Sequence, residues 1–188
     1  MEQNKVLSEI ERFEPYNEQE VEDKRAFIKY LNNFKDILYR ENSYGHITSS
    51  AWVVNKNRNK VLMIYHNIYN TWAWTGGHAD GDNNLINVAI REVQEETGIK
   101  NITPISYEIF TLDIIPVWGH IKKGKYVSSH QHLNVTYLLE ADEDETVRIK
   151  ADENSGVKWI DFKEINKYCS EKQMYPVYHK IIDKMKKL

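Results

Sequence analysis

The chain has 188 residues, of which 41% are hydrophobic and 28% charged, and its formal net charge is −3. This composition is typical of a folded soluble domain and lacks the strong positive charge of most nucleic-acid-binding proteins. No apolar segment approaches the ~18 residues of a membrane span, and residues 1–16 lack a signal-peptide hydrophobic region. The single cysteine, Cys169, excludes an intrachain disulfide and a multi-cysteine zinc site. We therefore expect a cytoplasmic protein that binds neither nucleic acid nor membranes.

The N-terminal part of the chain is predicted to be helical. The helix expected over residues 17–41 begins at Asn17, a favourable N-cap with Glu20 three residues later. Apolar side chains then recur every three or four residues, at Phe27, Leu31, Phe34 and Leu38. We assign residues 1–45 to an N-terminal helical extension and residues 46–188 to the main domain.

Strand patterns open the main domain. Two segments rich in β-branched and aromatic residues, 46–55 and 61–66, flank a polar turn and predict a hairpin. A short aromatic segment containing Trp72 and Trp74 then leads to a Gly76-Gly77 turn. Such aromatic side chains are more often part of a core. These two nevertheless alternate just before the turn, which makes them candidates to stack on a substrate base.

The rest of the chain alternates between helices and strands. Further strands are expected at 106–115, 131–140 and 157–160, the first of them ending at Pro116. Helices are expected at 84–97, 162–168 and 176–188. Strands on both sides of a central helix, with more helix near the end, predict an α/β fold with a mixed sheet covered on both faces.

Three glutamates on the predicted central helix are its most informative feature. Glu92, Glu95 and Glu96 are related by i, i+3 and i+4, so they share one face within an arc of roughly 100°. Three negative charges this close cost free energy unless a cation offsets them, and Mg²⁺ is the hard divalent cation that oxygen ligands favour. A solvated charged face is the alternative, and for three such residues taken alone it is the commoner one.

The residues around these glutamates resemble the Nudix box, Gly-x5-Glu-x7-Arg-Glu-(aliphatic)-x-Glu-Glu-x-Gly-(aliphatic). The match begins at Gly77, has Arg91 and Val93 at the required positions, and ends at Ile99. It departs at one slot, where Asn83 replaces the first glutamate. The resemblance implies a Nudix-type α/β/α sandwich with a mixed β-sheet, to which the N-terminal helix is added. It also implies a metal-dependent hydrolase that cleaves a diphosphate bond with Mg²⁺ or Mn²⁺.

The resemblance assigns roles to the box residues. A backbone oxygen at Gly77 and the carboxylates of Glu92, Glu95 and Glu96 would be the metal ligands. One of these carboxylates would accept a proton from the attacking water, with Glu92 favoured over Glu95. Arg91 would orient a carboxylate through a bidentate pair.

Two further acidic positions bear on the metal site. The glutamate missing at Asn83 usually pairs with the box arginine in the family, so Asp82 or Asp80 would have to substitute for it. The family also often takes an acidic ligand from a loop beyond the box. We favour Glu153 for that role, ahead of the two glutamates in the acidic loop at 141–145.

Histidines supply another set of candidates. His130 and His132 lie two residues apart and therefore on one side of a strand, and with His120 they would make a zinc site. Polar contact with a substrate phosphate, or structural hydrogen bonding, is the commoner role for such residues. His46 and His78 flank the sheet and the box. We take His78 and His132, together with the two tryptophans, as substrate-binding candidates.

The implied partner is a small-molecule nucleoside diphosphate derivative. Pro116 lies 17 residues after Ile99, near where ADP-ribose-type members carry a proline, so ADP-ribose is favoured over nucleoside triphosphates. A homodimer is expected because dimers are common in the family. The alternative is a non-catalytic Nudix-fold domain that senses or binds a ligand, against which the intact glutamates argue. A related isomerase of isopentenyl diphosphate is disfavoured, because Cys169 lies far from the early strands where its catalytic cysteine would be.

Overall fold

The computed structural model describes residues 3–122 and 124–188. Its strands are β1 (Gly45–Val54), β2 (Lys60–His66), β3 (Thr71–Ala73), β4 (Thr75–His78), β5 (Ile102–Pro104), β6 (Thr111–Val117), β7 (His120–Lys122), β8 (Lys125–Val127), β9 (His130–Ala141) and β10 (Asn154–Asp161). Its α-helices are α1 (Gln3–Arg12), α2 (Glu18–Asn33), α3 (Leu85–Thr97), α4 (Ile165–Tyr168) and α5 (Tyr175–Met185), and short 3₁₀ turns occupy Phe162–Glu164 and Lys172–Met174.

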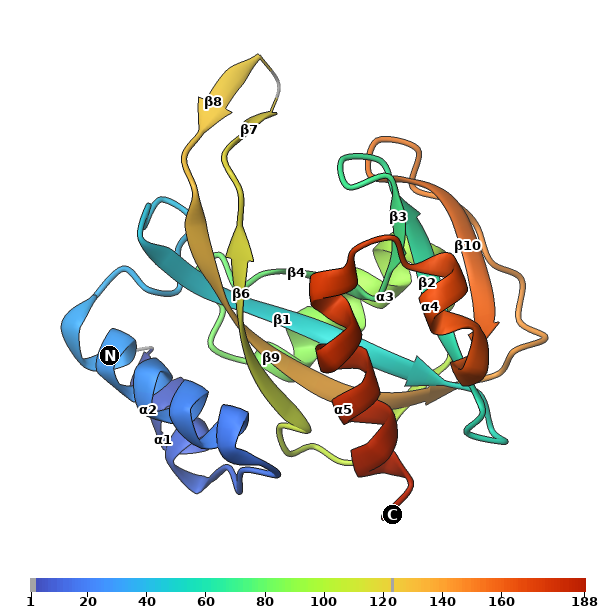
Figure 1. Ribbon diagram of the computed structural model, residues 1–188, viewed down its shortest axis with the longest axis horizontal. Helices are drawn as coiled ribbons and strands as arrows, with labels where there is room; N and C mark the ends of the chain where they lie inside the picture. The colour runs from blue at the N-terminus through green and yellow to red at the C-terminus, as the bar shows by residue number, and fades with distance from the viewer. Residues whose placement is uncertain (1–2, 123) are drawn as a thin grey trace.

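Eight of these strands form one mixed sheet. Its order is β10-β2-β1-β9-β5, with β3 beside β2, β4 beside β1 and β6 beside β9. The two central strands, β1 and β9, run parallel, and the other pairs of this sheet are antiparallel. β7 and β8 form a separate hairpin that projects from the β6–β9 end of the sheet (Figure 1).

The alternation of β1 divides the core into two layers. Every residue of β1 is buried, as expected for a central strand covered on both faces. Ile47, Ala51 and Val53 pack in one cluster with apolar residues of α1, α2 and α3. Trp52 and Val54 point the other way and pack with α5. Figure 1 shows α3 behind the sheet and α5 in front of it, so the predicted α/β/α sandwich is confirmed.

The box helix forms where the sequence predicts it. Leu85, Val88, Ala89 and Val93 are fully or almost fully buried against the sheet. Gly98 ends the helix in the left-handed conformation, with φ of 76°, which glycine adopts at no steric cost. The apolar stripe fixes which face of α3 meets the sheet. The polar face of α3 is thereby left at the edge of this packing.

The N-terminal helix is shorter than predicted. Asn17 caps α2 as expected, accepting a hydrogen bond from the backbone N–H of Glu20 at 3.0 Å. The helix ends at Asn33, however, so the predicted extension to residue 41 is wrong. The following segment lies against the sheet instead, because the N–H of Ile47 donates to the carbonyl oxygen of Ile37 at 2.8 Å. The apolar periodicity continues past the helix end because this segment is also buried.

Pro116 does not end a strand. The predicted strand at 106–115 is β6, which begins later, at Thr111, and continues to Val117 with Pro116 opposite Gln131. Among the described strands, β6 pairs with β9 alone. It is therefore an edge strand, where proline, which has no N–H to donate, is tolerated. The β7–β8 hairpin that follows was not predicted.

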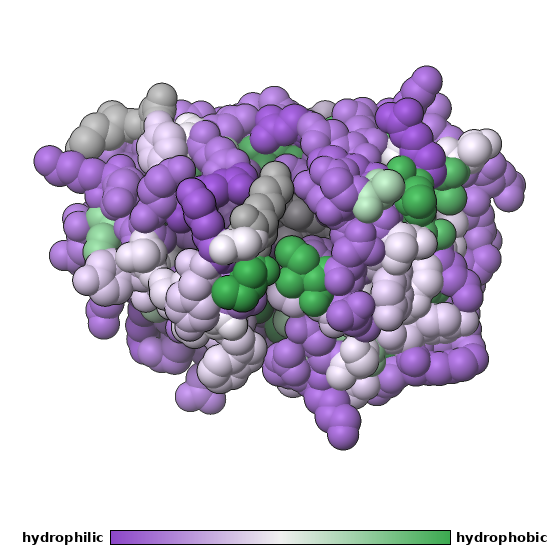
Figure 2. All heavy atoms as spheres, turned by 90° about the horizontal axis from the view of Figure 1, so that it is seen from above, coloured by the Kyte–Doolittle hydropathy of each residue, from purple (hydrophilic) through white to green (hydrophobic). Residues whose placement is uncertain are grey.

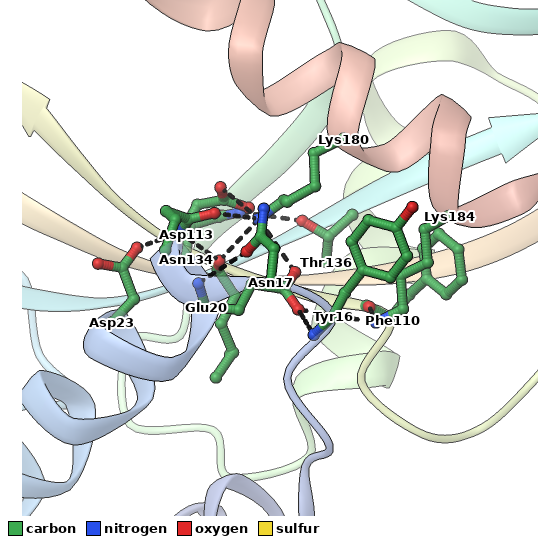
Figure 3. Close-up of polar contacts among 12 residues, drawn as sticks. Tyr16, Asn17, Glu20, Asp23, Phe110, Asp113, Asn134, Thr136, Lys180 and Lys184 are labelled. Carbon is green, nitrogen blue, oxygen red and sulfur yellow. Dashed lines mark hydrogen bonds and ion pairs between the residues drawn. The ribbon is translucent and has the colours of Figure 1, made fainter.

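A buried group of charges joins α2 to the sheet and to α5 (Figure 3). Lys180 Nζ lies 3.0 Å from Glu20 Oε1 and 2.8 Å from Asp113 Oδ1. It also donates to the side chain of Gln19 and to the carbonyl oxygen of Leu112. Burial raises the pKa of Asp113 to about 6 against the opposing attraction of Lys180. Helix α2 is therefore tied into the same core by charge as well as by apolar contact.

The surface is largely hydrophilic on the face seen in Figure 2. Hydrophobic residues appear there in small separate groups. Large side chains that are exposed near the projecting hairpin include Trp118, Ile121 and Tyr126. Among the described residues, no helix is long and apolar enough to cross a membrane.

Candidate active site

Two glycines of β4 bring the box glutamates against the sheet. Gly77 pairs with Ser49 of β1, and a Cβ added to Gly77 would overlap the carboxylate of Glu92. The N–H of Gly76 donates to Glu96 Oε2 at 3.2 Å. A side chain at Gly77 would fill the space that the Glu92 carboxylate occupies, so this glycine is what permits the close approach. The backbone around Gly77 is thus within reach of the carboxylate group.

The electrostatics of the group are those of crowded, partly buried carboxylates. Glu96 is only 4% exposed, and burial followed by repulsion from Glu92 raises its pKa well above the usual range. Burial, then the charges of Glu95 and Glu153, raise the pKa of Glu92. A bound cation would favour the ionised form of both groups. The arrangement therefore places oxygen ligands where negative charge is costly unless it is neutralised.

Lys150 links the box to a fourth glutamate. Its Nζ lies 3.1 Å from Glu95 Oε2 and 3.0 Å from Glu153 Oε2. Burial lowers the pKa of Lys150, but the hydrogen bonds to Glu153 and Glu95 outweigh this effect and raise it overall. The structure therefore places Glu153, the favoured loop residue, beside the box carboxylates. The alternatives are occupied elsewhere: Glu143 pairs with Lys60, and Glu145 accepts from the backbone of Lys100.

Asp82 faces the box arginine in place of the missing glutamate. Arg91 Nη1 lies 3.5 Å from Asp82 Oδ2, and Asp82 also accepts from the backbone N–H two residues later at 2.8 Å. Asp80 is engaged by Arg40 in a two-pronged ion pair. Asn83 therefore leaves the arginine with an acidic neighbour supplied by the preceding residue. Among the described residues, the contact of Arg91 with a carboxylate is this single one to Asp82, not the bidentate pair that was expected.

The donor set fits a hard divalent cation. Mg²⁺ and Mn²⁺ take carboxylate and carbonyl oxygens. Such oxygens are supplied here by Glu92 against Gly77, by Glu96 at the N–H of Gly76, and by Glu95 and Glu153, which Lys150 joins. The overlap that a Cβ on Gly77 would cause and the raised pKa values of two carboxylates are the observations that support this fit.

The two tryptophans pack among other aromatic rings. Trp72 makes edge-on contacts with Tyr65 and Tyr168, at centroid distances of 5.7 and 6.2 Å. Trp74 lies edge-on to Tyr178 at 5.4 Å and to Trp52 at 6.4 Å. Both are half-buried beside the α5 layer. Packing accounts for these positions, and a stacking role toward a substrate stays a prediction.

The histidines gather differently from the prediction. His130 and His132 lie together on β9. The ring centroid of His46, on β1, lies 4.8 Å from that of His130 and 5.1 Å from that of His132. The ring centroid of His78, on β4, lies 5.2 Å from that of His132. His120 lies on β7, where its Nδ1 contacts the carbonyl oxygen of Trp118. The less favoured alternative, a zinc trio of His130 and His132 with His120, is therefore not formed; His46 is the third member of the cluster. Burial lowers the pKa of His46, which favours its neutral form.

A model of the NUDIX domain matches residues 46–184. The chain belongs to the Nudix family. It is 30% identical over 145 residues to an RNA pyrophosphohydrolase of Pelagibacter ubique, over 72% of this chain and 88% of that protein. Its enzyme class is that of the Nudix pyrophosphohydrolases.

Solved structures agree with the fold of this Nudix chain. An Ap4A hydrolase of C. elegans superposes with a TM-score of 0.52 at 17% identity, covering 76% of this chain and 98% of the other. The dihydroneopterin triphosphate pyrophosphohydrolase of E. coli superposes with a TM-score of 0.55 at 14% identity, covering 73% and 94%. At these identities the likeness concerns the fold alone.

Three contributions to this site were not evident from the Nudix sequence. Lys150 had no assigned role, and no local pattern marks it, because its two glutamate partners come from α3 and a loop before β10. Arg40 engages Asp80 from the segment after α2. His46 joins the other histidines only through the parallel pairing of β1 with β9.

Proposed function

We propose that this Nudix chain hydrolyses a diphosphate bond in a nucleotide-derived small molecule, with Mg²⁺ or Mn²⁺ as the required ion. The observation that supports this most strongly is the group of box carboxylates, in which Glu92 lies against Gly77, Glu96 accepts from Gly76, and Lys150 joins Glu95 to Glu153. The ion would be held by a backbone oxygen at Gly77 and by the carboxylates of Glu92, Glu95, Glu96 and Glu153. When bound, it would screen the diphosphate charge and lower the pKa of a bound water.

The chain's own residues supply the remaining steps. Glu92 is proposed to accept the proton of the attacking water at a carboxylate oxygen, because its carboxylate lies against the backbone of Gly77. Glu95 is the second catalytic candidate and is held by Lys150. Arg91, paired with Asp82, is proposed to hold the box loop against the first turns of α3. Phosphoryl transfer depends mainly on such positioning and on electrostatics.

The proposed substrate is a nucleoside that carries a chain of phosphates. The name of one relative supports this choice, since it is called an RNA pyrophosphohydrolase. Pro116, which favoured ADP-ribose, lies exposed in an edge strand where local structure accounts for it. We therefore place nucleoside polyphosphates first and ADP-ribose second. His78, His132, Trp72 and Trp74 remain the proposed contacts to the substrate.

The proposal includes the setting of the reaction. A small-molecule nucleotide substrate and the near-neutral composition favour a cytoplasmic enzyme without a nucleic-acid or membrane partner. A homodimer is proposed by analogy with the family, and light scattering coupled to size-exclusion chromatography measures it directly. A 5′-triphosphorylated RNA tests the proposal that nucleic acid is not a partner, since its turnover would make RNA a substrate.

The experiment is a phosphate- or nucleotide-release screen with Mg²⁺ and Mn²⁺. The panel comprises Ap4A, nucleoside triphosphates with their oxidised forms, 5′-triphosphorylated RNA, ADP-ribose, nucleotide sugars and NADH. The inactive control is Glu95→Gln/Glu96→Gln, and the matched control is Glu143→Gln/Glu145→Gln, which alters two glutamates outside the site. We expect turnover in the wild type and the matched control and none in the box variant. Substrate binding without turnover in the wild type would overturn the proposal and favour a non-catalytic ligand sensor.

A further inference from the structure

Three histidines on one face of the sheet form a cluster separate from the box glutamates. His46 lies opposite His132 in the parallel pairing of β1 with β9, and His130 lies two residues earlier on the same face. One ring nitrogen from each of the three lies within 4.8 Å of the others. His46 is 3% exposed, and the other two are half-buried. Two parallel strands thus hold three imidazoles around one small volume.

Hydrogen bonds fix the tautomers of two of these rings. His46 Nδ1 lies 3.1 Å from the carbonyl oxygen of Asn42, and His130 Nδ1 lies 2.8 Å from that of Ser128. A carbonyl oxygen only accepts, so each Nδ1 carries the proton and each Nε2 presents a lone pair. Metal-bound histidines commonly donate their second ring nitrogen to a carbonyl oxygen in this way. Both rings are therefore oriented as metal ligands are.

The Nε2 atom of His46 is the second observation. It is buried and has no hydrogen-bond partner among the described residues. A buried polar atom left unpaired costs free energy, and in native proteins such an atom usually marks a missing water, ion or functional role. An ion bound between the three rings would satisfy it. The half-buried positions of His130 and His132 leave a path from solvent.

We infer that His46, His130 and His132 bind a divalent transition-metal ion, with Zn²⁺ as the best match. Neutral imidazole nitrogen is a ligand for Zn²⁺, Ni²⁺ and Cu²⁺, whereas Mg²⁺ takes oxygen. Zn–N bonds of about 2.0–2.1 Å place tetrahedral partners roughly 3.3 Å apart, so the rings would have to approach one another by up to about 1.5 Å. Side-chain rotation of the two half-buried histidines supplies such a movement.

The site lies across β4 from the glutamates. Gly77 faces Glu92, and the next residue, His78, points to the opposite face of the sheet, as alternation in a strand requires. The ring centroid of His78 lies 4.9 Å from that of His46 and 5.2 Å from that of His132. With three protein ligands, the fourth position would take water or another ligand beside His78. The ion would join the N-terminal ends of β1 and β9.

Titration of the tag-free full chain with ZnCl₂, followed by calorimetry, tests this inference. The box variant Glu95→Gln/Glu96→Gln serves as background, so that zinc cannot be held by those two glutamates. We expect one Zn²⁺ per chain, and an affinity at least tenfold weaker after His130→Gln/His132→Gln. His120→Gln is the matched control, because this residue lies outside the cluster, and its affinity should equal that of the background.

Cobalt absorption provides a readout that does not depend on the variants. Co²⁺ bound to three imidazoles and water in a tetrahedral site gives intense visible bands, whereas Co²⁺ on oxygen ligands in an octahedral site gives weak ones. We expect intense bands that Zn²⁺ abolishes by competition. Absence of stoichiometric Zn²⁺ binding, an unchanged affinity in the double histidine variant, or only weak bands in the unaltered cluster would each overturn the inference. The cobalt spectrum of the unaltered cluster tests the inference even if the double histidine variant does not fold.

Discussion

Replacing Lys180 with methionine is predicted to destabilise the protein strongly. Its ammonium group lies within 3.0 Å of carboxylates on Glu20 and Asp113, and all three side chains are at most 5% exposed. Lys180→Met keeps much of the apolar side chain but leaves Asp113 buried without its cation, and it leaves Glu20 only the longer contact with Lys184 at 3.8 Å. Breaking a buried ion pair in this way costs about 3–5 kcal/mol of unfolding free energy.

The same group predicts a dependence of stability on pH. The pKa of Asp113 is raised from 3.8 to about 6, chiefly by burial, so the folded state binds a proton more tightly than the unfolded state. Protonation of Asp113 therefore stabilises the folded state. This contribution to the unfolding free energy is fully present below pH 3.8 and is lost as the pH rises through 6. It amounts to about 3 kcal/mol, at 1.36 kcal/mol per pKa unit. Asp113→Asn should flatten this part of the profile while Lys180 keeps its contact with Glu20.

Urea unfolding followed by tryptophan fluorescence at pH 4, 5, 6, 7 and 8 measures both effects. The wild type should lose stability between pH 4 and 6 from this group, and Asp113→Asn should lack that component. Lys180→Met should be several kcal/mol less stable at pH 7 and should recover part of the loss at pH 4, where carboxylates take up protons. A cost below about 1 kcal/mol at pH 7 would refute the reasoning, because it would mean that water reaches the two carboxylates.

Three smaller changes test the candidate active site. Gly77→Ala should lower kcat about 10²-fold by displacing the Glu92 carboxylate. Its melting temperature, measured by calorimetry, should stay close to that of the wild type. A clearly lower melting temperature would contradict this reading, because the loss of activity would then reflect unfolding. Lys150→Met should lower the Mg²⁺ concentration for half-maximal activity several-fold, since it removes a cation that competes for the carboxylates; a higher requirement would argue against competition. Asp82→Asn should lower kcat/KM roughly fivefold, equivalent to about 1 kcal/mol, and Asn83→Glu added to it should restore activity; absence of rescue would show that the box arginine needs no acidic partner.

Local patterns predicted the box and its helix because both depend on nearby residues. The apolar stripe of α3 and the glycine at its end determine its length and its buried face without reference to the rest of the fold. The box spacing likewise places three carboxylates on one side of that helix. The fourth carboxylate, Glu153, was predicted from the family pattern. In the structure it lies beside Lys150, which also contacts Glu95.

Features that depend on distant partners were not predictable in this way. α2 ends at Asn33 because the segment after it bonds to β1, although its apolar spacing continues as in a helix. Pro116 is accommodated because β6 lies at an edge, and edge position is a property of the sheet order. The choice of His46 over His120 as neighbour of His132 follows from the parallel pairing of strands far apart in the sequence.

The measurement that tests the account most directly is Mn²⁺ binding followed by electron paramagnetic resonance, with hydrolysis measured on the same samples. The wild type should bind Mn²⁺ and turn over its substrate. Glu95→Gln/Glu96→Gln/Glu153→Gln should lose both, whereas Glu143→Gln/Glu145→Gln should keep both. If the triple variant retains tight Mn²⁺ binding or metal-dependent turnover, then the carboxylates around Gly77 are not the metal site and the central claim is wrong.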